Sequence, residues 1–239
     1  RRYTLSVVSL TFGALVKFIP LLLFPAALVV GWRDQQEPRD RYRFLAKTAI
    51  LVFLTVMVSY SPFRDGGNLL DVERRARLFT TSIPAVVYKA LRPSLGIDTA
   101  AYLVILVTLL GLGIFVLYQS LRRNSTETAN HFLMTVFNIL VYYLMVACLW
   151  FQQWYGLWLV TLAALLPKHA RRLALFFSFW VLSKQLIFAP KLVPHIILRP
   201  EWAAGYEALL TIAVLGAPWI YAINNMQRSQ QIRSSHETT

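Results

Sequence analysis

Residues 99–121 read TAAYLVILVTLLGLGIFVLYQSL, a run of 23 residues without a charged side chain. A helix of about 20 apolar residues is long enough to cross a bilayer. Similar apolar stretches recur on both sides of this run, with short basic loops between them. Hydrophobic residues make up 57% of the 239 residues, and charges cluster between the runs instead of alternating with them. The pattern predicts an all-α, polytopic integral membrane protein.

Hydropathy divides the chain into about seven transmembrane helices. The first apolar stretch, residues 3–32, is longer than one crossing requires and contains Lys17, Pro20 and Pro25. We therefore expect a broken element, with a short piece at residues 5–15 and a crossing at residues 18–32. The remaining predicted spans are residues 44–60, 99–121, 132–150, 155–166, 173–188 and 203–223.

These spans form one predicted transmembrane domain, residues 1–223, which contains a loop at 61–98 and is followed by a polar tail at 224–239. Three other loops, which open at Arg33, Arg122 and Lys168, hold clusters of Lys and Arg, and the positive-inside tendency places them and the tail in the cytoplasm. The turn at residues 151–155 has no Lys or Arg and is expected outside. The loop at 61–98 is then external, although it holds six basic residues. We expect a location in the plasma (inner) membrane of a prokaryotic cell envelope. Because the chain begins Arg1-Arg2-Tyr3 without Met, we expect the C-terminal part of a longer protein.

The formal net charge of +13 does not predict a nucleic-acid partner, since Lys and Arg lie at the ends of apolar runs, where they anchor helices. The single cysteine, Cys148, cannot form an intrachain disulfide. The four histidines have neither the pairing nor the spacing of a metal site. We predict no metal ion and no other cofactor, and membrane lipids as the surroundings.

Residues 69–79, LLDVERRARLF, predict a short amphipathic helix on the external membrane surface. Two acidic residues precede arginines by four positions, so surface ion pairs that support a helix are one interpretation. A second interpretation is that Arg64, Arg74 and Arg75 bind the phosphate of a lipid-linked substrate, because planar guanidinium groups make bidentate contacts with phosphate.

Lys17 and Lys184 lie within or near the ends of apolar runs. An ionisable side chain at such a place snorkels to the interface, pairs, or lines a wet cavity. If the first element is broken near Lys17, the freed backbone groups and this cation together favour an anion at that depth.

Three short motifs resemble those of one enzyme class. Residues 17–25, KFIPLLLFP, resemble the Lys-aromatic-x-Pro-Leu-Leu-Leu-x-Pro segment of polytopic GT-C glycosyltransferases, especially family 87 and mannosyltransferase-like proteins. Residues 60–63, YSPF, resemble the Tyr-x-Pro-Phe that opens an external loop in these proteins. Residues 152–158, QQWYGLW, resemble their Gln-Pro-Trp-Tyr-Leu-Leu-Trp turn, with Gln153 in place of Pro. The order of the spans is also similar, so the resemblance covers most of the chain.

The resemblance implies transfer of a sugar from a polyprenyl-phosphate donor to a glycan or glycolipid acceptor on the external side. Family members carry the catalytic carboxylate in an external loop of their N-terminal half, where an Asp acts as general base, so this segment alone is expected to be inactive. Here the candidate carboxylates are Asp65 and Glu73, and no motif marks either as the base. By motif position, Lys17, Gln152, Trp154 and Tyr155 are expected cavity or substrate contacts.

Other interpretations stay open. Trp154 and Tyr155 also fit ordinary anchors at a membrane interface. A transporter or flippase of lipid-linked intermediates would use the same broken helix and intramembrane cations. A non-catalytic membrane scaffold would need no base. A carboxylate in an external loop before Arg1 would favour the enzyme over the carrier.

Overall fold

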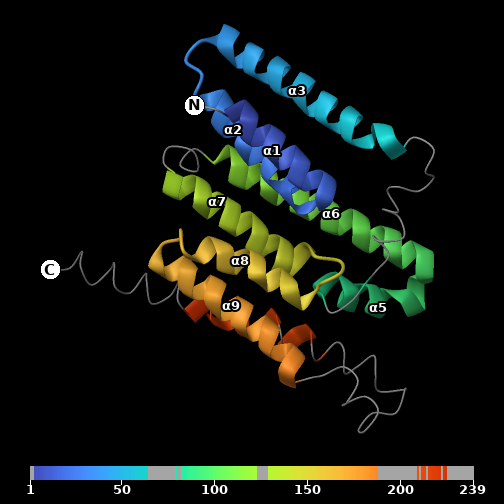
Figure 1. Cartoon of the computed structure of the whole chain (residues 1–239). Coiled ribbons are helices and arrows are strands. Elements are labelled where there is room, and N and C mark those ends of the chain that lie inside the picture. The colour runs from blue at the N-terminus through green and yellow to red at the C-terminus, as the bar shows by residue number, and fades with distance from the viewer. Residues whose placement is uncertain are drawn as a thin grey trace, which may run out of the picture. The chain divides into compact units, whose positions relative to one another are not determined.

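The computed structural model of the chain describes residues 3–63, 79, 82–122, 129–187, 209, 211–213, 215–221 and 223–224. Every regular element within these ranges is a helix (Figure 1), which confirms the all-α prediction for this part of the chain. Two of the helices, α3 (Pro38–Tyr60) and α6 (Ile97–Leu121), are long and apolar enough to cross a membrane. By length and composition, the structure thus supports two of the seven predicted spans.

The chain divides into two compact units. Unit 1 comprises residues 1–75 and 110–139, and unit 2 comprises residues 76–109 and 140–239. Helices α6 and α7 (Ala129–Tyr142) contribute residues to both units.

Unit 1 begins with the predicted broken element. Helix α1 (Tyr3–Val16) ends before Lys17, a 3-10 turn η1 (Ile19–Leu23) follows, and α2 (Phe24–Arg33) resumes the helix. Pro20 and Pro25 occupy the first turns of η1 and α2, where the missing N–H of proline costs no helical hydrogen bond. The break is confirmed. The second piece, expected as a crossing at residues 18–32, consists of η1 followed directly by α2 and is shorter than the two helices long enough to span a membrane.

Arg33 joins the end of α2 to the end of α6. Its Nη2 donates to the carbonyl oxygen of Leu121 at 2.7 Å, and its Nη1 donates to that of Arg122 at 3.4 Å. These carbonyls have no partner within the last turn of a helix, so a guanidinium group satisfies them well. The two basic loops that follow α2 and α6 therefore start at the same end of unit 1.

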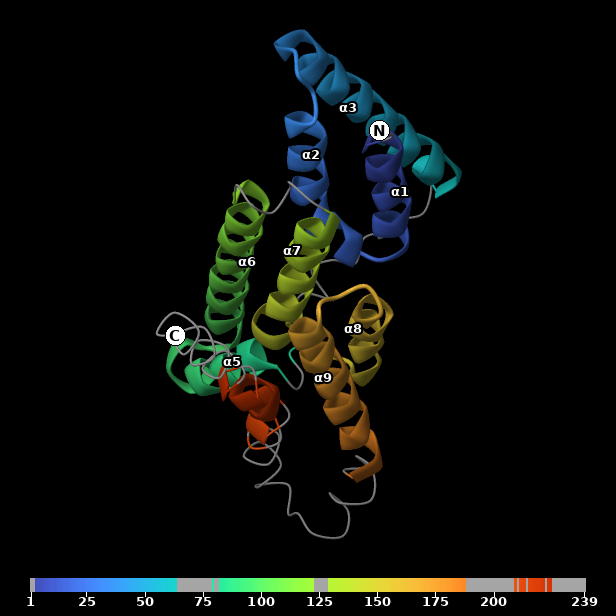
Figure 2. The same ribbon diagram turned by 90° about the vertical axis from the view of Figure 1, so that its left-hand side faces the viewer.

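Unit 2 holds α5 (Ile83–Leu95), the π-helical segment η4 (Tyr143–Ala147), the turn η5 (Gln153–Tyr155), α8 (Gly156–Ala163) and α9 (Lys168–Ile187). Helix α7 widens into η4 and ends before Cys148, so the ordinary helix expected at residues 132–150 is wrong at its C-terminal end. Helices α8 and α9 lie side by side (Figures 1 and 2). Two residues near the C-terminal end of the described chain contact α9: Trp180 donates to the Ala213 carbonyl at 3.2 Å, and the rings of Phe176 and Tyr221 stack.

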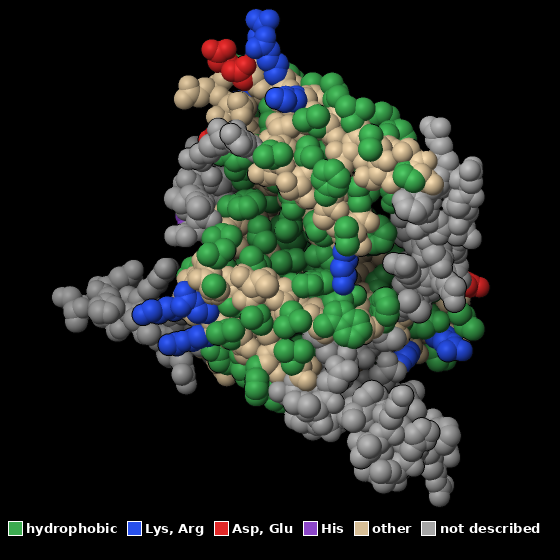
Figure 3. Space-filling model, in the orientation of Figure 1, with side chains coloured by type: hydrophobic (Ala, Val, Ile, Leu, Met, Phe, Trp, Pro, Cys, Tyr) green, Lys and Arg blue, Asp and Glu red, His purple; other side chains and the backbone are tan. Residues whose placement is uncertain are grey.

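The described core contains both small and large side chains, and many other large apolar side chains are exposed. The buried alanines of the described chain are Ala26, Ala27, Ala85, Ala100, Ala101, Ala147, Ala163, Ala170 and Ala174. The exposed side chains of α3 and α6 include Ile50, Phe53, Leu54, Met57, Val58, Leu106, Val107, Leu110, Ile114 and Leu117. Hydrophobic side chains accordingly cover much of the described surface in Figure 3.

The contact between α2 and α3 gives a first prediction. A Cβ atom at Gly31 would overlap the Phe44 ring, whereas a Cβ at Gly113 meets nothing within 4 Å. We expect Gly31→Val to lower the free energy of unfolding by about 1–3 kcal/mol through overpacking, seen as a lower Tm in detergent. Gly113→Val, the same change at an open helical glycine, is the control. Adding Phe44→Ala to Gly31→Val should restore part of the Tm; equal Tm values for the two glycine variants would contradict the contact.

Candidate functional site

The third motif forms a turn between η4 and α8, which we call the aromatic turn (residues 151–158). Before it, the Cys148 thiol donates to the Trp150 carbonyl at 3.3 Å. The Ser82 hydroxyl, at the start of α5, donates to the Leu149 carbonyl at 3.0 Å. Within the turn, the Tyr155 N–H donates to the Gln152 carbonyl at 3.0 Å. Backbone groups outside the helices are thus hydrogen-bonded, as a buried loop requires.

Buried rings form the base of the aromatic turn. Phe151 is 2% exposed and meets Phe177 of α9 edge-on, with 6.3 Å between the ring centroids. Tyr155 is 7% exposed and stacks on Trp158, with centroids 4.3 Å apart and planes 19° from parallel. Edge-to-face and offset-stacked pairs are the favourable arrangements of aromatic rings. Phe151 and Tyr155 therefore fix the shape of the turn.

Trp154 is the ring that the turn presents outward. It is 50% exposed and stands at 89° to the Tyr155 ring, with the centroids 6.2 Å apart. Gln152, two residues earlier, is half-buried and carries an amide that both donates and accepts hydrogen bonds. An aromatic face and an amide on one turn suit an uncharged ligand with both C–H and O–H groups, and neither side chain transfers protons near neutral pH.

Helix α9 holds the turn through Gly156 and Ser178. The Ser178 Oγ lies 2.7 Å from the carbonyl oxygens of Gly156 and Ala174, so its single proton is shared between these two acceptors. A Cβ atom at Gly156 would lie 3.3 Å from the Ser178 Cα atom. Glycine is therefore needed at the start of α8 for this close approach of two backbones.

Of the residues predicted from sequence, the structure brings together Gln152, Trp154 and Tyr155. Lys184 lies on α9 in the same unit, and its side chain is outside the described part. Lys17 is exposed just after the end of α1 and belongs to unit 1. Other predicted residues and segments lie outside the described residues, namely Arg64, Asp65, Glu73, Arg74, Arg75, residues 69–78 of the amphipathic helix and residues 225–239 of the tail.

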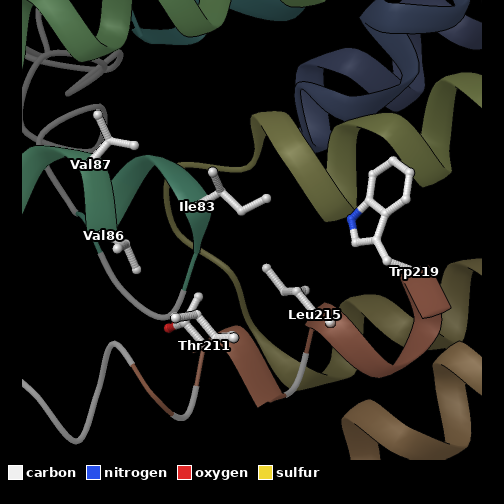
Figure 4. A pocket seen from close by; sticks show the side chains of 8 residues that line it. Ile83, Val86, Val87, Thr211, Leu215 and Trp219 are labelled. Carbon is white, nitrogen blue, oxygen red and sulfur yellow. The ribbon is translucent and has the colours of Figure 1, made fainter.

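Unit 2 contains an apolar cavity of about 260 Å³ that the sequence did not predict (Figure 4). One wall is α5, which lies inside the predicted external loop, and the other is formed by residues 211–219. The lining residues are Ile83, Val86, Val87, Thr211, Ile212, Leu215, Gly216 and Trp219. The helical spacing of Ile83, Val86 and Val87 is the signal that indicates an apolar face.

Within the described ranges, no three His, Cys, Asp or Glu side chains gather to hold a metal ion. No protein-family model, curated protein or solved structure matches the chain. The aromatic turn, the cavity and the sequence motifs are therefore the basis for inferring function.

Phe151 is buried and Trp154 is half-exposed, so removing the two rings should change the free energy of unfolding by different amounts. Phe151→Ala should lower the free energy of unfolding by about 3–5 kcal/mol, because it empties a packed site in the base of the turn. Trp154→Ala removes a half-exposed ring and should change it by less than about 1 kcal/mol. Thermal unfolding in the same detergent measures both; a larger loss for Trp154→Ala than for Phe151→Ala would show that the turn is packed differently.

Proposed function

We propose that the chain is embedded in the plasma (inner) membrane of a prokaryote through about seven spans. The observation behind this proposal is the exposure of large apolar side chains on α3 and α6. In water, each such side chain would forgo about 1.5–3 kcal/mol of burial. Arg33 hydrogen-bonds the end of α6, so the basic loops that follow α2 and α6 start at the same end of unit 1. This arrangement agrees with a common cytoplasmic side for these loops and for the C-terminal tail.

We further propose that the full-length protein is a mannosyltransferase-like glycosyltransferase with a polyprenyl-phosphate-linked sugar as donor. The observation that carries this proposal is the half-exposed Trp154 ring on a turn fixed by Phe151 and Tyr155, at the motif that resembles the GT-C class. The C–H face of a sugar ring packs on the negative face of an indole, and the Gln152 amide bonds sugar hydroxyls. Tyr155, being buried, supports the turn.

The phosphate of the carrier needs cations. In this proposal Arg64, Arg74, Arg75 and Lys17 bind it, and Lys184 is a further candidate. The cavity in unit 2 suits a hydrocarbon, such as part of the polyprenyl chain, because its described lining is apolar apart from the Thr211 hydroxyl and the Trp219 indole N–H. Asp65 and Glu73 remain candidate carboxylates without an assigned role, and the reaction is proposed for the full-length protein.

A transporter or flippase of lipid-linked intermediates is the second candidate function. The broken element between α1 and α2 favours it, because transporters place substrate sites at interrupted helices. Sugar transfer by the full-length protein distinguishes the two, since a carrier moves its substrate without cleaving the bond to phosphate.

Trp154→Ala in the full-length protein should reduce kcat/KM for transfer from a polyprenyl-phosphate mannose by about tenfold, equivalent to about 1.4 kcal/mol. Trp154→Phe should retain part of the activity because it keeps an aromatic face. Phe179→Ala on α9, which removes another exposed ring of unit 2, is the control and should leave transfer unchanged. Full activity in Trp154→Ala would mean that Trp154 is only a membrane anchor.

The double variant Arg74→Ala, Arg75→Ala in the full-length protein should abolish binding of polyprenyl phosphate, because two phosphate-binding guanidinium groups are lost. Equilibrium binding of the radiolabelled carrier to purified protein measures this, and the amount of folded protein in the membrane should not change. The conservative variant Arg74→Lys, Arg75→Lys keeps the charge but loses the planar fork, so partial binding is expected. Wild-type affinity in the alanine variant would remove the phosphate role.

A further inference from the structure

Both ends of the broken element contact α3 at nearly the same level. At the start of α1, Thr4 accepts a hydrogen bond from Thr48, with the two Oγ1 atoms 3.5 Å apart. At the end of α2, Gly31 lies against the ring of Phe44. Thr48 and Phe44 are about one helical turn apart, or about 6 Å along the axis of α3. The chain therefore leaves this level in α1 and comes back to it in α2.

The reversal occurs at η1, which folds against the end of α1. The Lys17 N–H donates to the Gly13 carbonyl at 2.8 Å, which closes the last turn of α1. The Pro20 side chain packs on Gly13, 3.0 Å from the position that a Cβ atom would occupy there. Figure 2 shows the resulting hairpin of α1 and α2 beside α3.

The arms of the hairpin are too short for two ordinary crossings. Helix α1 has 14 residues and is about 21 Å long, and η1 with α2 is about 25 Å long, whereas a hydrocarbon core is about 30 Å thick. Helix α1 runs along α3 in the same direction (Figure 1), so Val16 reaches the level of Tyr60, since each lies 12 residues beyond the Thr4–Thr48 contact. The tip of the hairpin and the end of α3 thus lie at the same level.

We infer that α1, η1 and α2 form a hairpin whose two ends lie on one side of the membrane and whose tip lies near the opposite face, where the Lys17 side chain extends to the lipid headgroups. The tip is open, since Val16 is 90% exposed and Phe18 and Leu21 are also exposed. Apolar side chains around one cation suit the boundary between hydrocarbon and phosphate, where a lysine extends its ammonium group outward. This inference rests on the membrane embedding in the proposed function and holds for an enzyme or a carrier.

Single cysteines in the full chain, in a Cys148→Ala background, test the inference with a membrane-impermeant maleimide. The positions are Tyr3 and Gln36 at the ends of the hairpin, Phe18 at its tip, and Ser61 after α3. In right-side-out and inverted vesicles, we expect Tyr3→Cys and Gln36→Cys to react from one side and Phe18→Cys and Ser61→Cys from the other. Reaction of Tyr3→Cys and Gln36→Cys from opposite sides would show a single crossing and overturn the hairpin. A Phe18→Cys variant that reacts from the side of Gln36, or from neither side, would overturn the position of the tip.

Two substitutions of Lys17 test whether its charge holds the tip of the hairpin in place. In the Phe18→Cys background, Lys17→Leu should reduce the rate of labelling at least fivefold because the cation no longer holds the tip at the headgroups, and Lys17→Arg should keep the rate. Equal rates in all three proteins would remove this role. Alkaline carbonate extraction comes first: a chain released from the membrane refutes the embedding itself, whereas a retained chain with the wrong labelling pattern refutes only the hairpin.

Discussion

Carbonyl groups at the ends of helices are the polar groups that this all-helical chain must satisfy, and side chains from other elements satisfy several of them. Arg33 binds the last carbonyls of α6, and Arg171 donates to Ala163 and Leu166 at the end of α8. Such groups cost several kcal/mol each when they face hydrocarbon without a partner. Part of the positive charge in the basic loops therefore stabilises the ends of helices.

The same requirement decides where the first element can break. A proline within a helix removes one hydrogen bond and clashes with the preceding turn. Pro20 and Pro25 avoid this cost because each stands in the first turn of a new element. The tight contact of Pro20 with Gly13 then turns the chain back, and the position of Lys17 follows from that contact instead of from hydropathy.

The sequence was sufficient to predict helices, the break near Lys17 and the motif residues of the aromatic turn. It did not predict that the chain returns at the break, because hydropathy measures the length of an apolar stretch and carries no direction. Nor did it separate Trp154 from Tyr155, since two adjacent aromatic residues are equivalent until Phe151 and Phe177 bury one side of the turn. Hydropathy did not predict helix α5, because its 13 residues are too few for a span. Ser82, Ile83 and Pro84 nevertheless have the pattern of a helix start.

Burial of small residues explains how the two regions of interest are held in place. In the membrane proposed for the chain, the surrounding lipid would be as apolar as the side chains, so close packing would replace the hydrophobic effect as the source of stability. Glycine supplies the closest contacts here, at Gly31 against Phe44 and at Gly156 against Ser178. The first contact positions the hairpin that carries Lys17, and the second positions the turn that presents Trp154. A larger side chain at Gly31 or Gly156 would push the neighbouring element away and so displace a proposed binding residue. These two glycines are therefore positions where stability and function are coupled.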